Sequence, residues 1–596
     1  MRGHAVLLAV SLAAPLAAEP GPSKIDPWLQ GRFEQVGRTE FLVLLEDSAR
    51  PPAGASLKPH DLYAALTQSA RASQAKVLAD LKVRGVAARP FYIVNGILVE
   101  GDAALAGALA ARPEVSRIVG NPRVLGARGW PAGGAAPALD PVEWNIVMVR
   151  AHDVWSTYGT LGEGIVVASA DTGVDWSHPE LTGRYRGYAP TPGDVDHAYA
   201  WHDAFGVHGV PFDDFDHGTP TTGTMVAING IGMAPAATWI ACRNMENGFG
   251  TPASYIDCME WTLAPYPQGG DPMTDGRPDM APHIVNNSWV CPPSEGCDAH
   301  TLDEALARVR QAGILMIAAA GNDGPSCSTV AEPPAPSAAV FSVGAVDNVR
   351  NITSFSSRGP VMVDGSGRLK PDLVAPGLFV TTTGRGGGHR TLAGTSIAAP
   401  HVSGAAALLW SNRPGLRGLV GLTHCILARS ASPTAGDPSA QTCGGIPSGT
   451  LPNHVLGHGL LDIHAAFELA STDADPAPDV CDCAPVDASA YGAPAEVTEV
   501  RVEGAGSIAW DSQDPDTGPG ILYDVLRGDL ATLSQGVDAA GCLAHDLTTS
   551  STNDSVDPAP GTGLYYLVRA RNACGTSAWG AGGQNTACPD TTLSWR

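Results

Sequence analysis

Short apolar runs alternate with amphipathic stretches along residues 141–472. The apolar runs are rich in Val, Ile and Ala, and they cover residues 164–171, 237–245, 283–289, 313–321 and 340–347. Most are apolar on both faces, as is typical of strands buried in a parallel sheet, whereas the stretches between them have the apolar spacing of helices. We therefore predict an α/β fold with a parallel sheet that helices cover on both faces. Ligands of such folds bind beyond the carboxyl ends of the strands.

A smaller unit precedes this region. Residues 39–125 predict a strand, a helix over residues 61–83, two strands joined by a turn at Asn95-Gly96, a second helix and a last strand. This pattern indicates a small α/β unit. The Gly-, Ala- and Pro-rich residues 126–140 then form a linker with little capacity to pack, which makes them a natural site for proteolysis.

The chain changes character after residue 472. Residues 473–490 are acidic and rich in Pro, and residues 491–588 alternate strand-like segments with Gly, Pro, Asp and Ser. The second pattern predicts an all-β sandwich. The aspartates of residues 473–490 offer oxygen ligands for calcium, but their spacing is not that of an EF-hand. We therefore interpret this stretch as a linker.

The N-terminus has the pattern of a secretory signal peptide. In residues 1–18, a short basic segment precedes an apolar stretch that is too short to span a bilayer. The alternative is a buried N-terminal strand or helix. No later stretch has 18 or more continuous apolar residues, so we expect no membrane anchor. The prediction is a protein that is secreted to the extracellular space, with the periplasm as a compartment of transit.

The cysteines agree with export. The chain has 12 Cys, an even number, as expected for disulfides in an oxidising compartment. Cys291 and Cys297 lie close enough in sequence to close a small loop, and Cys542 and Cys574 are placed to join two strands of the sandwich. The connectivity does not follow from sequence alone.

The charge excludes one class of partner. The chain has 36 basic and 60 acidic residues, a net charge of −24, so a phosphate backbone is a poor ligand and we expect no nucleic acid. The charge is uneven, since residues 1–139 carry +4 and residues 140–596 carry −28. Opposite signs favour docking of the first segment on the second.

Three polar residues carry the candidate chemistry. Asp171 ends an apolar run, His217 precedes a helix-forming stretch, and Ser396 starts a helix of small residues. Each alone is commonly a turn, structural or capping residue. Together, an Asp, a His and a Ser in this chain order match one known arrangement of a serine nucleophile with its base. Asn322 follows another apolar run, where its amide can donate to a developing oxyanion.

The sequences around these residues carry a family resemblance. The segments Asp-Thr-Gly-Val-Asp at Asp171, His-Gly-Thr at His217, Gly-Asn at Asn322 and Gly-Thr-Ser at Ser396 resemble motifs of the subtilisin-like serine proteases, or subtilases. The resemblance covers residues 141–470. Within the family, the segments at residues 232–245 and 286–289 resemble the bacillopeptidase F-like branch. It implies a protease domain over residues 141–472. Residues 39–125 resemble the inhibitory propeptide of subtilases, and residues 491–588 resemble a fibronectin type III-like module.

The resemblance implies a role for each residue. Ser396 would attack the scissile carbonyl, His217 would act as general base, and Asp171 would orient His217. Asn322 would complete the oxyanion hole. The residues implied to line the substrate cleft and the pocket for the side chain that precedes the cleaved bond are Ser288, Trp289, Val290, Ala319, Ala320 and Gly321.

Two residues depart from the family pattern. Pro220 stands where most subtilases have His and alters the first helical turn, where proline is tolerated. Val290 stands where relatives usually have Gly. A side chain at position 290 would reshape the cleft. The sequence therefore does not predict which substrate side chain is preferred before the cleaved bond. The chemistry needs no cofactor. Structural calcium is frequent in the family, but no site can be located from the sequence.

These observations predict a secreted serine endopeptidase that is made as an autoprocessed precursor. Its expected partners are polypeptide substrates and its own propeptide, which would act as an intramolecular inhibitor, and we expect a monomer. The alternative is a binding or adhesion protein that uses the C-terminal sandwich and has an inert protease domain. The complete set of Asp171, His217 and Ser396 favours the protease.

Overall fold

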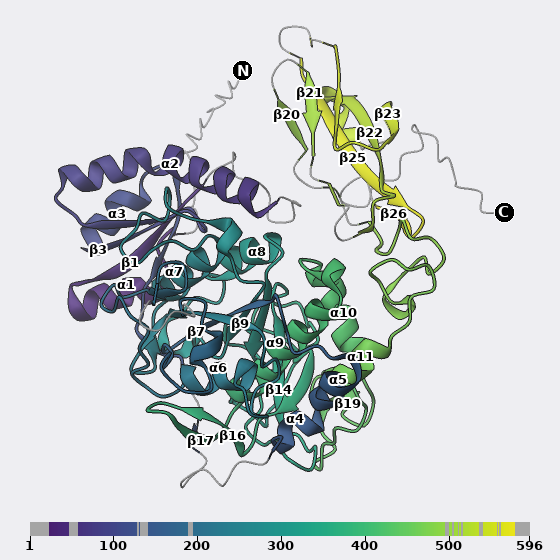
Figure 1. The fold of residues 1–596 in the computed structure, drawn as a ribbon. Helices are drawn as coiled ribbons and strands as arrows, with labels where there is room; N and C mark the ends of the chain where they lie inside the picture. Colours follow the sequence, from purple (N-terminus) through teal and green to yellow (C-terminus); the bar gives the residue numbers. More distant parts are fainter. Residues whose placement is uncertain are drawn as a thin grey trace, which may run out of the picture.

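A computed structural model describes most of the chain between residues 23 and 577 (Figure 1). The described residues are 23–46, 58–127, 130–131, 141–188, 195–494, 497, 500–503, 506–510, 512–513, 517–535, 540–556, 558 and 562–577. The predicted signal peptide lies outside them. Within this part of the chain, every helix is either too short or too polar to cross a membrane.

The N-terminal unit is an antiparallel sheet with helices, in the strand order β2-β3-β1-β4. Its elements are α1 (Pro27–Val36), β1 (Arg38–Leu45), α2 (Pro59–Val83), β2 (Ala88–Phe91), β3 (Gly96–Asp102), α3 (Ala103–Ala110) and β4 (Val115–Gly120). One buried cluster is formed by apolar residues of the helices α1, α2 and α3 and of the strands β1, β3 and β4. The small α/β fold predicted for residues 39–125 is therefore present.

The structure differs from the prediction at two places in this unit. Helix α1 precedes residue 39 and belongs to the unit, because Leu29 and Phe33 are buried in its core. The second difference is the hairpin, where β2 ends at Phe91 and the four residues Tyr92–Asn95 form the turn. The apolar residues of this turn are buried in the core of the following domain rather than in a strand.

The central domain is built on a parallel sheet, as predicted. Its strand order is β15-β14-β13-β12-β7-β9-β8. The strands are β7 (Val166–Asp171), β8 (Trp201–Asp203), β9 (Thr238–Arg243), β12 (Ile284–Asn287), β13 (Leu315–Ala319), β14 (Phe341–Val346) and β15 (Leu373–Pro376). Strands β8 and β9 lie on one side of β7, and the following strands, β12 to β15, lie on its other side. The strand order therefore reverses beside β7. The carboxyl end of β7 is thus the expected ligand crevice.

Two pairs of helices cover this sheet (Figure 1). Helices α6 (Gly218–Val226) and α9 (Thr395–Asn412) pack together, and α9 runs along β12 to β15. Helices α7 (Pro252–Leu263) and α8 (Asp303–Gln311) also pack together and contact β9 and β13. Nearly all residues of α6, α7 and α9 are buried, which explains their low content of charge.

Shorter elements surround the sheet. The remaining helices of this domain are α4 (Trp144–Met148), α5 (Ala151–Tyr158), α10 (Val420–Arg429) and α11 (Ile463–Glu468). Single turns of 3₁₀-helix cover Thr182–Arg184, Pro278–Met280, Pro293–Glu295 and Pro414–Leu416. The short strands are β5 (Val124–Leu125), β6 (Trp130–Pro131), β10 (Met245–Glu246), β11 (Phe249–Gly250), β16 (Val380–Gly384), β17 (Gly388–Ala393), β18 (Thr442–Cys443) and β19 (Ile446–Pro447).

The C-terminal region contains two antiparallel sheets, as the β-sandwich prediction requires. Their orders are β20-β21-β24 and β23-β22-β25-β26. The strands are β20 (Arg501–Glu503), β21 (Ser507–Ala509), β22 (Leu522–Asp529), β23 (Gly541–Leu547), β24 (Ser551–Asn553), β25 (Leu564–Asn572) and β26 (Gly575–Thr576). The rings of Trp510 and Tyr523 pack together in the apolar cluster of this region, with their centroids 5.4 Å apart. Turns of 3₁₀-helix lie at Asp479–Cys481 and Leu530–Gln535.

Five disulfides join described cysteines. They are Cys242–Cys258, Cys291–Cys297, Cys327–Cys443, Cys425–Cys481 and Cys483–Cys574. The small loop closed by Cys291 and Cys297 is confirmed. The pairing of Cys542 with Cys574 is wrong, because Cys574 bonds to Cys483 and thereby ties the sandwich back to the preceding acidic stretch.

Candidate active site

Asp171 is the last residue of β7, at the carboxyl edge of the sheet. Its side chain is fully buried. The Oδ1 atom accepts a hydrogen bond from the backbone N–H of Thr172 at 2.7 Å, and Oδ2 accepts one from Thr221 Oγ1 at 3.3 Å. These bonds fix the orientation of the carboxylate in the crevice that the strand order defines.

His217 immediately precedes α6 and contacts this carboxylate. Its Nδ1 lies 2.7 Å from Asp171 Oδ1. The close packing of the two elements depends on Gly218, because a Cβ there would lie 2.1 Å from the carbonyl oxygen of Gly173. The other ring nitrogen, Nε2, is buried and has no hydrogen-bond partner among the described residues. This arrangement leaves Nε2 as the free proton acceptor.

The acidic residues that precede His217 form structural contacts. Buried Asp213 accepts hydrogen bonds from Thr172 Oγ1 at 2.8 Å and from the backbone N–H of Thr219 at 2.9 Å. These bonds join the end of β7 to the start of α6. Asp216 pairs with Arg390 at 2.7 Å, and the group therefore holds the His217 loop in place.

Ser396 lies in the first turn of α9, where backbone N–H groups are free of intrahelical partners. Its Oγ is buried and has no hydrogen-bond partner among the described residues. Gly394, directly before the helix, has a φ of +149°, and a Cβ on it would lie 2.9 Å from Ser396 Oγ and 3.5 Å from Asn322 Nδ2. The missing side chain of Gly394 thus leaves a small space beside both groups.

The amide of Asn322 is oriented toward this space by Thr395. The backbone N–H and the Oγ1 of Thr395 both donate to Asn322 Oδ1, each at 2.9 Å. With its oxygen engaged in this way, the amide leaves Nδ2 as the group near Ser396. A donor of this kind beside a nucleophile is the arrangement that stabilises an oxyanion.

Ser288 contacts the backbone of Ser396 through its side chain. Its Oγ donates to the backbone oxygen of Ser396 at 2.7 Å and accepts a hydrogen bond from Asn286 at 2.8 Å. Asn286 in turn accepts one from Ser403 of α9 at 3.1 Å. The Ser288 side chain therefore supports the first turn of α9, which contains Ser396. Sequence reasoning missed Asn286, although its position just before the predicted cleft residues was a usable signal.

The other predicted cleft residues lie at the ends of β12 and β13. Trp289 stacks on Tyr255 with ring centroids 3.8 Å apart, and the backbone N–H of Val290 donates to Gly126 at 3.2 Å. On the side of Asn322, β13 ends at Ala319, and Ala320 and Gly321 follow it. The N–H of Gly321 donates to Thr395 Oγ1 at 3.2 Å.

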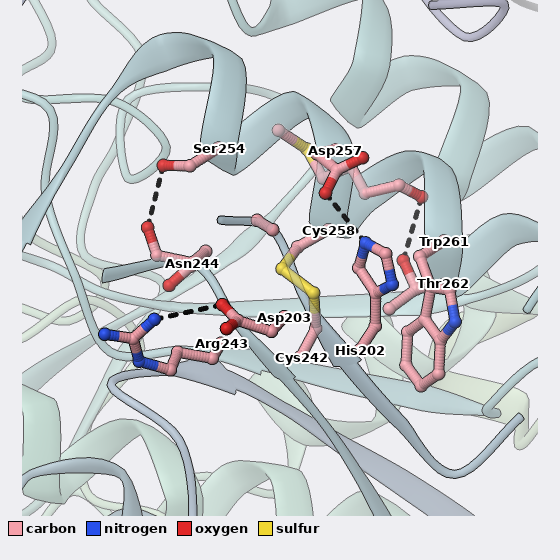
Figure 2. Close-up of a disulfide and its surroundings, with 12 residues drawn as sticks. His202, Asp203, Cys242, Arg243, Asn244, Ser254, Asp257, Cys258, Trp261 and Thr262 are labelled. Atoms are coloured by element: carbon pink, nitrogen blue, oxygen red, sulfur yellow. Dashed lines mark hydrogen bonds and ion pairs between the residues drawn. A yellow bond between two sulfur atoms is a disulfide. The ribbon is translucent and has the colours of Figure 1, made fainter. Parts of the chain in front are cut away.

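Figure 2 shows how helix α7 is attached beside the site. The disulfide Cys242–Cys258 joins it to β9. Ser254 Oγ donates to the backbone oxygen of Asn244 at 2.7 Å. The N–H of Asn244 donates in turn to the backbone oxygen of Asp171 at 2.9 Å. The helix is thus linked to the end of β7 through two hydrogen bonds.

The described residues of the segment after the N-terminal unit, 124–127 and 130–131, pair with strands of the central domain. Strand β5 pairs with β11, and the N–H groups of Gly126 and Ala127 both reach the oxygen of Gly248 at 3.1 Å. Strand β6 then pairs with β17, with Trp130 opposite Ala393. An extended segment that pairs with strand edges on both sides of a cleft is positioned as a peptide substrate is in β-strand addition.

The electrostatics of His217 lead to a prediction for the pH dependence. Burial disfavours its charged form, but the charge of Asp171 and the hydrogen bond to it outweigh burial, so the pKa of His217 lies above its ordinary value. A general base works when neutral, and activity should therefore rise with pH through this raised pKa. We expect kcat/KM of the processed protein to reach half its maximum above about pH 6.5, the ordinary His value. The profile is measured with a peptide substrate that has no titrating groups. A half-maximal kcat/KM below about pH 6.5 would contradict the raised pKa of His217.

Comparison with known proteins agrees with this geometry. The model of the subtilase family matches residues 162–440. The chain is 34% identical over 501 residues to bacillopeptidase F of Bacillus subtilis (strain 168), an alignment that covers 77% of this chain and 33% of the relative. It is 34% identical over 264 residues to the thermophilic serine proteinase of Bacillus sp. (strain AK1), an alignment that covers 43% of this chain and 54% of the relative. It is also 32% identical over 278 residues to subtilisin BL of Lederbergia lenta, an alignment that covers 46% of this chain and 86% of the relative.

The fold and the comparisons define the class of protein: the chain belongs to the subtilase family. Within that family, it is similar to the bacillopeptidase F branch. The chain spans a third of the length of bacillopeptidase F and about half of that of the thermophilic serine proteinase.

Proposed function

We propose that this protein is a secreted serine endopeptidase, made as a precursor that processes itself. The observation that carries the proposal is the contact of His217 Nδ1 with Asp171 at 2.7 Å, which leaves Nε2 free. Ser396 lies beside Asn322 at the start of α9, the helix that packs on α6 directly after His217. The family membership supports the same reaction, and export agrees with the signal-peptide pattern and the disulfides.

The reaction uses these groups in order. Ser396 Oγ attacks the scissile carbonyl while His217 Nε2 takes its proton, and the oxygen of the carbonyl becomes an oxyanion. His217 then gives the proton to the leaving amine, the peptide bond breaks, and an acyl-enzyme forms on Ser396. Water hydrolyses the acyl-enzyme by the same proton transfers. Asp171 keeps the imidazole in the required tautomer and stabilises its charged form.

The oxyanion would be held by Asn322 and the start of α9. The Nδ2 of Asn322 and the N–H of Ser396 both border the space beside Gly394. Removal of such an amide donor in a subtilisin raises the barrier by about 2.7–4 kcal/mol. All of these steps are carried by protein groups.

The N-terminal unit would act as an intramolecular inhibitor. Its turn residues Tyr92 and Ile93 donate their N–H groups to Glu260 Oε2 on α7, at 2.6 and 3.0 Å. Burial of Glu260 between the two domains raises its pKa to about 8. Arg89 also forms an ion pair with Asp257 of the same helix. These contacts, with the segment that crosses the cleft, support the proposal that the unit blocks substrate access until it is cut off.

The maturation cut should lie between Ala127 and Trp130. The chain is paired with the cleft on both sides of these residues, at Gly126–Ala127 and at Trp130, and Trp130 pairs next to the segment that leads into Ser396. N-terminal sequencing of the mature protein should therefore find Arg128, Gly129 or Trp130 at the first position. The Ser396→Ala variant should stay at precursor size. A mature N-terminus outside this interval, or normal processing of the variant, would contradict the proposal.

The proposed partners follow from this chemistry. They are polypeptide substrates and the protein's own N-terminal unit, and the chain is proposed to act as a monomer. The opposite net charges of residues 1–139 and 140–596 favour docking of the inhibitor, as the ion pairs Arg89–Asp257 and Arg117–Asp298 illustrate.

A further inference from the structure

Three aspartates come together in the acidic loop between α11 and the C-terminal sheets. One carboxylate oxygen from each of Asp473, Asp475 and Asp482 lies within 4.8 Å of the other two. The Oδ1 atoms are occupied, since Asp475 Oδ1 accepts the N–H of Ala477 and Asp482 Oδ1 accepts the N–H of Ala484, both at 2.7 Å. The cluster is therefore a formed arrangement of side chains rather than a run of solvated acidic residues.

The second oxygen of each carboxylate is left without a partner. The Oδ2 atoms of Asp473, Asp475 and Asp482 are all buried and accept no hydrogen bond from the described residues. As a whole residue, Asp482 is 9% exposed, and Asp473 and Asp475 are partly buried. Among the described Lys, Arg and His side chains, none forms an ion pair with these three. Carboxylates of like charge at this distance, each with one oxygen shielded from water, are unfavourable without a compensating positive charge.

Covalent and hydrogen bonds prevent the loop from opening to relieve this repulsion. Thr472 donates its N–H and its Oγ1 to the two oxygens of Asp479, at 2.7 and 2.6 Å. The neighbours of Asp482 are both in disulfides, since Cys481 bonds to Cys425 of α10 and Cys483 bonds to Cys574 of the sandwich. The three carboxylates are thus held together at the junction of the two domains.

We propose that Asp473, Asp475 and Asp482 bind a calcium ion that stabilises the junction between the protease domain and the C-terminal sheets. Carboxylate oxygens are the ligands of hard cations, and the neighbouring cysteines are in disulfides and so do not supply the thiolates that zinc prefers. Two oxygens at about 2.4 Å from one calcium ion are at most about 4.8 Å apart, which agrees with the observed cluster. This function is separate from peptide hydrolysis and does not involve Ser396.

The site can be tested by counting bound calcium. The full chain carrying Ser396→Ala, which avoids self-digestion, is titrated with calcium chloride by isothermal titration calorimetry. The same chain with Asp475→Asn in addition should bind one calcium ion fewer per molecule. The matched control is Asp487→Asn, which removes the same charge from the same segment outside the cluster and should bind as many ions as the parent. Equal stoichiometry in the parent and the Asp475→Asn variant would overturn the proposal.

A second measurement does not depend on how the variant folds. In the parent chain, amide hydrogen exchange of residues 471–484 should slow at least tenfold in about 1 mM calcium relative to excess chelator. Exchange of the sheet residues β13 and β14 should stay unchanged. If the loop exchanges at the same rate with calcium and with chelator, the proposal is wrong.

Discussion

Replacing Ser396 with alanine is expected to lower kcat for peptide hydrolysis by about 10⁶-fold, the effect seen when the nucleophile of a subtilisin is removed. The expectation follows from the position of Ser396 in the first turn of α9, with its Oγ free beside Asn322 Nδ2. Alanine removes the attacking oxygen and fits the same space, so the fold should be retained. The measurement is cleavage of a quenched fluorescent peptide by the processed wild type and by the variant after an added protease has cut it in the linker, since the variant is expected to stay at precursor size.

The matched control for this variant is Ser411→Ala. Ser411 lies near the end of the same helix, and its Oγ donates to the backbone oxygen of Glu163 at 2.8 Å, away from the crevice. The control should be processed and should retain its activity. Equal loss in both variants would show that the effect comes from damage to α9 rather than from loss of a nucleophile. Retained activity in Ser396→Ala would contradict the proposed chemistry outright.

Replacing Asp171 with asparagine is expected to lower kcat by about 10⁴-fold with little change in KM. The carboxylate holds His217 at 2.7 Å through Nδ1, which leaves Nε2 free to take the proton from Ser396. An asparagine amide of the same shape can present its N–H to Nδ1 and so favour the wrong tautomer. Because substrate groups do not contact Asp171, binding should be nearly unaffected.

The pH profile separates this role from a structural one. Loss of the Asp171 charge and of its hydrogen bond removes the largest influences that raise the pKa of His217, while burial still lowers it and Asp213 and Asp216 raise it less. The residual activity of Asp171→Asn should therefore reach its midpoint at a lower pH than the wild type. The control is Asp153→Asn on α5, which removes the same charge at a residue paired with Arg150. Its kcat and its pH midpoint should equal those of the wild type. An unshifted midpoint in Asp171→Asn would mean that the carboxylate does not act on His217.

The crevice was accessible to sequence reasoning because it depends on strand ends. Asp171 ends β7 and Asn322 follows β13, and both strands are short apolar runs in the sequence. Parallel strands bring such residues to one edge of the sheet, whatever their distance in the chain. The contact between Asp171 and His217 then requires that α6 pack closely on β7, a demand that the glycine after His217 already indicates.

Other features depend on contacts between distant segments, and the local pattern did not predict them. Residues Tyr92–Val94 look like part of a strand because they are apolar, yet they are buried against another domain. Likewise, the support of Ser396 by Ser288 requires β12 and α9 to be in place. The pairing of Cys483 with Cys574 is set by how the sandwich docks on the acidic stretch, which spacing alone does not reveal.

The central claim is that Ser396 is an activated nucleophile, and the most direct measurement is labelling with a fluorophosphonate probe followed by mass spectrometry of the peptides. The account predicts that the processed wild type takes up one label per molecule, located on Ser396, and that the Ser396→Ala variant takes up none. No label on the processed wild type, or a label on another serine, would contradict it. Such a result would favour the alternative of a binding protein with an inert protease domain.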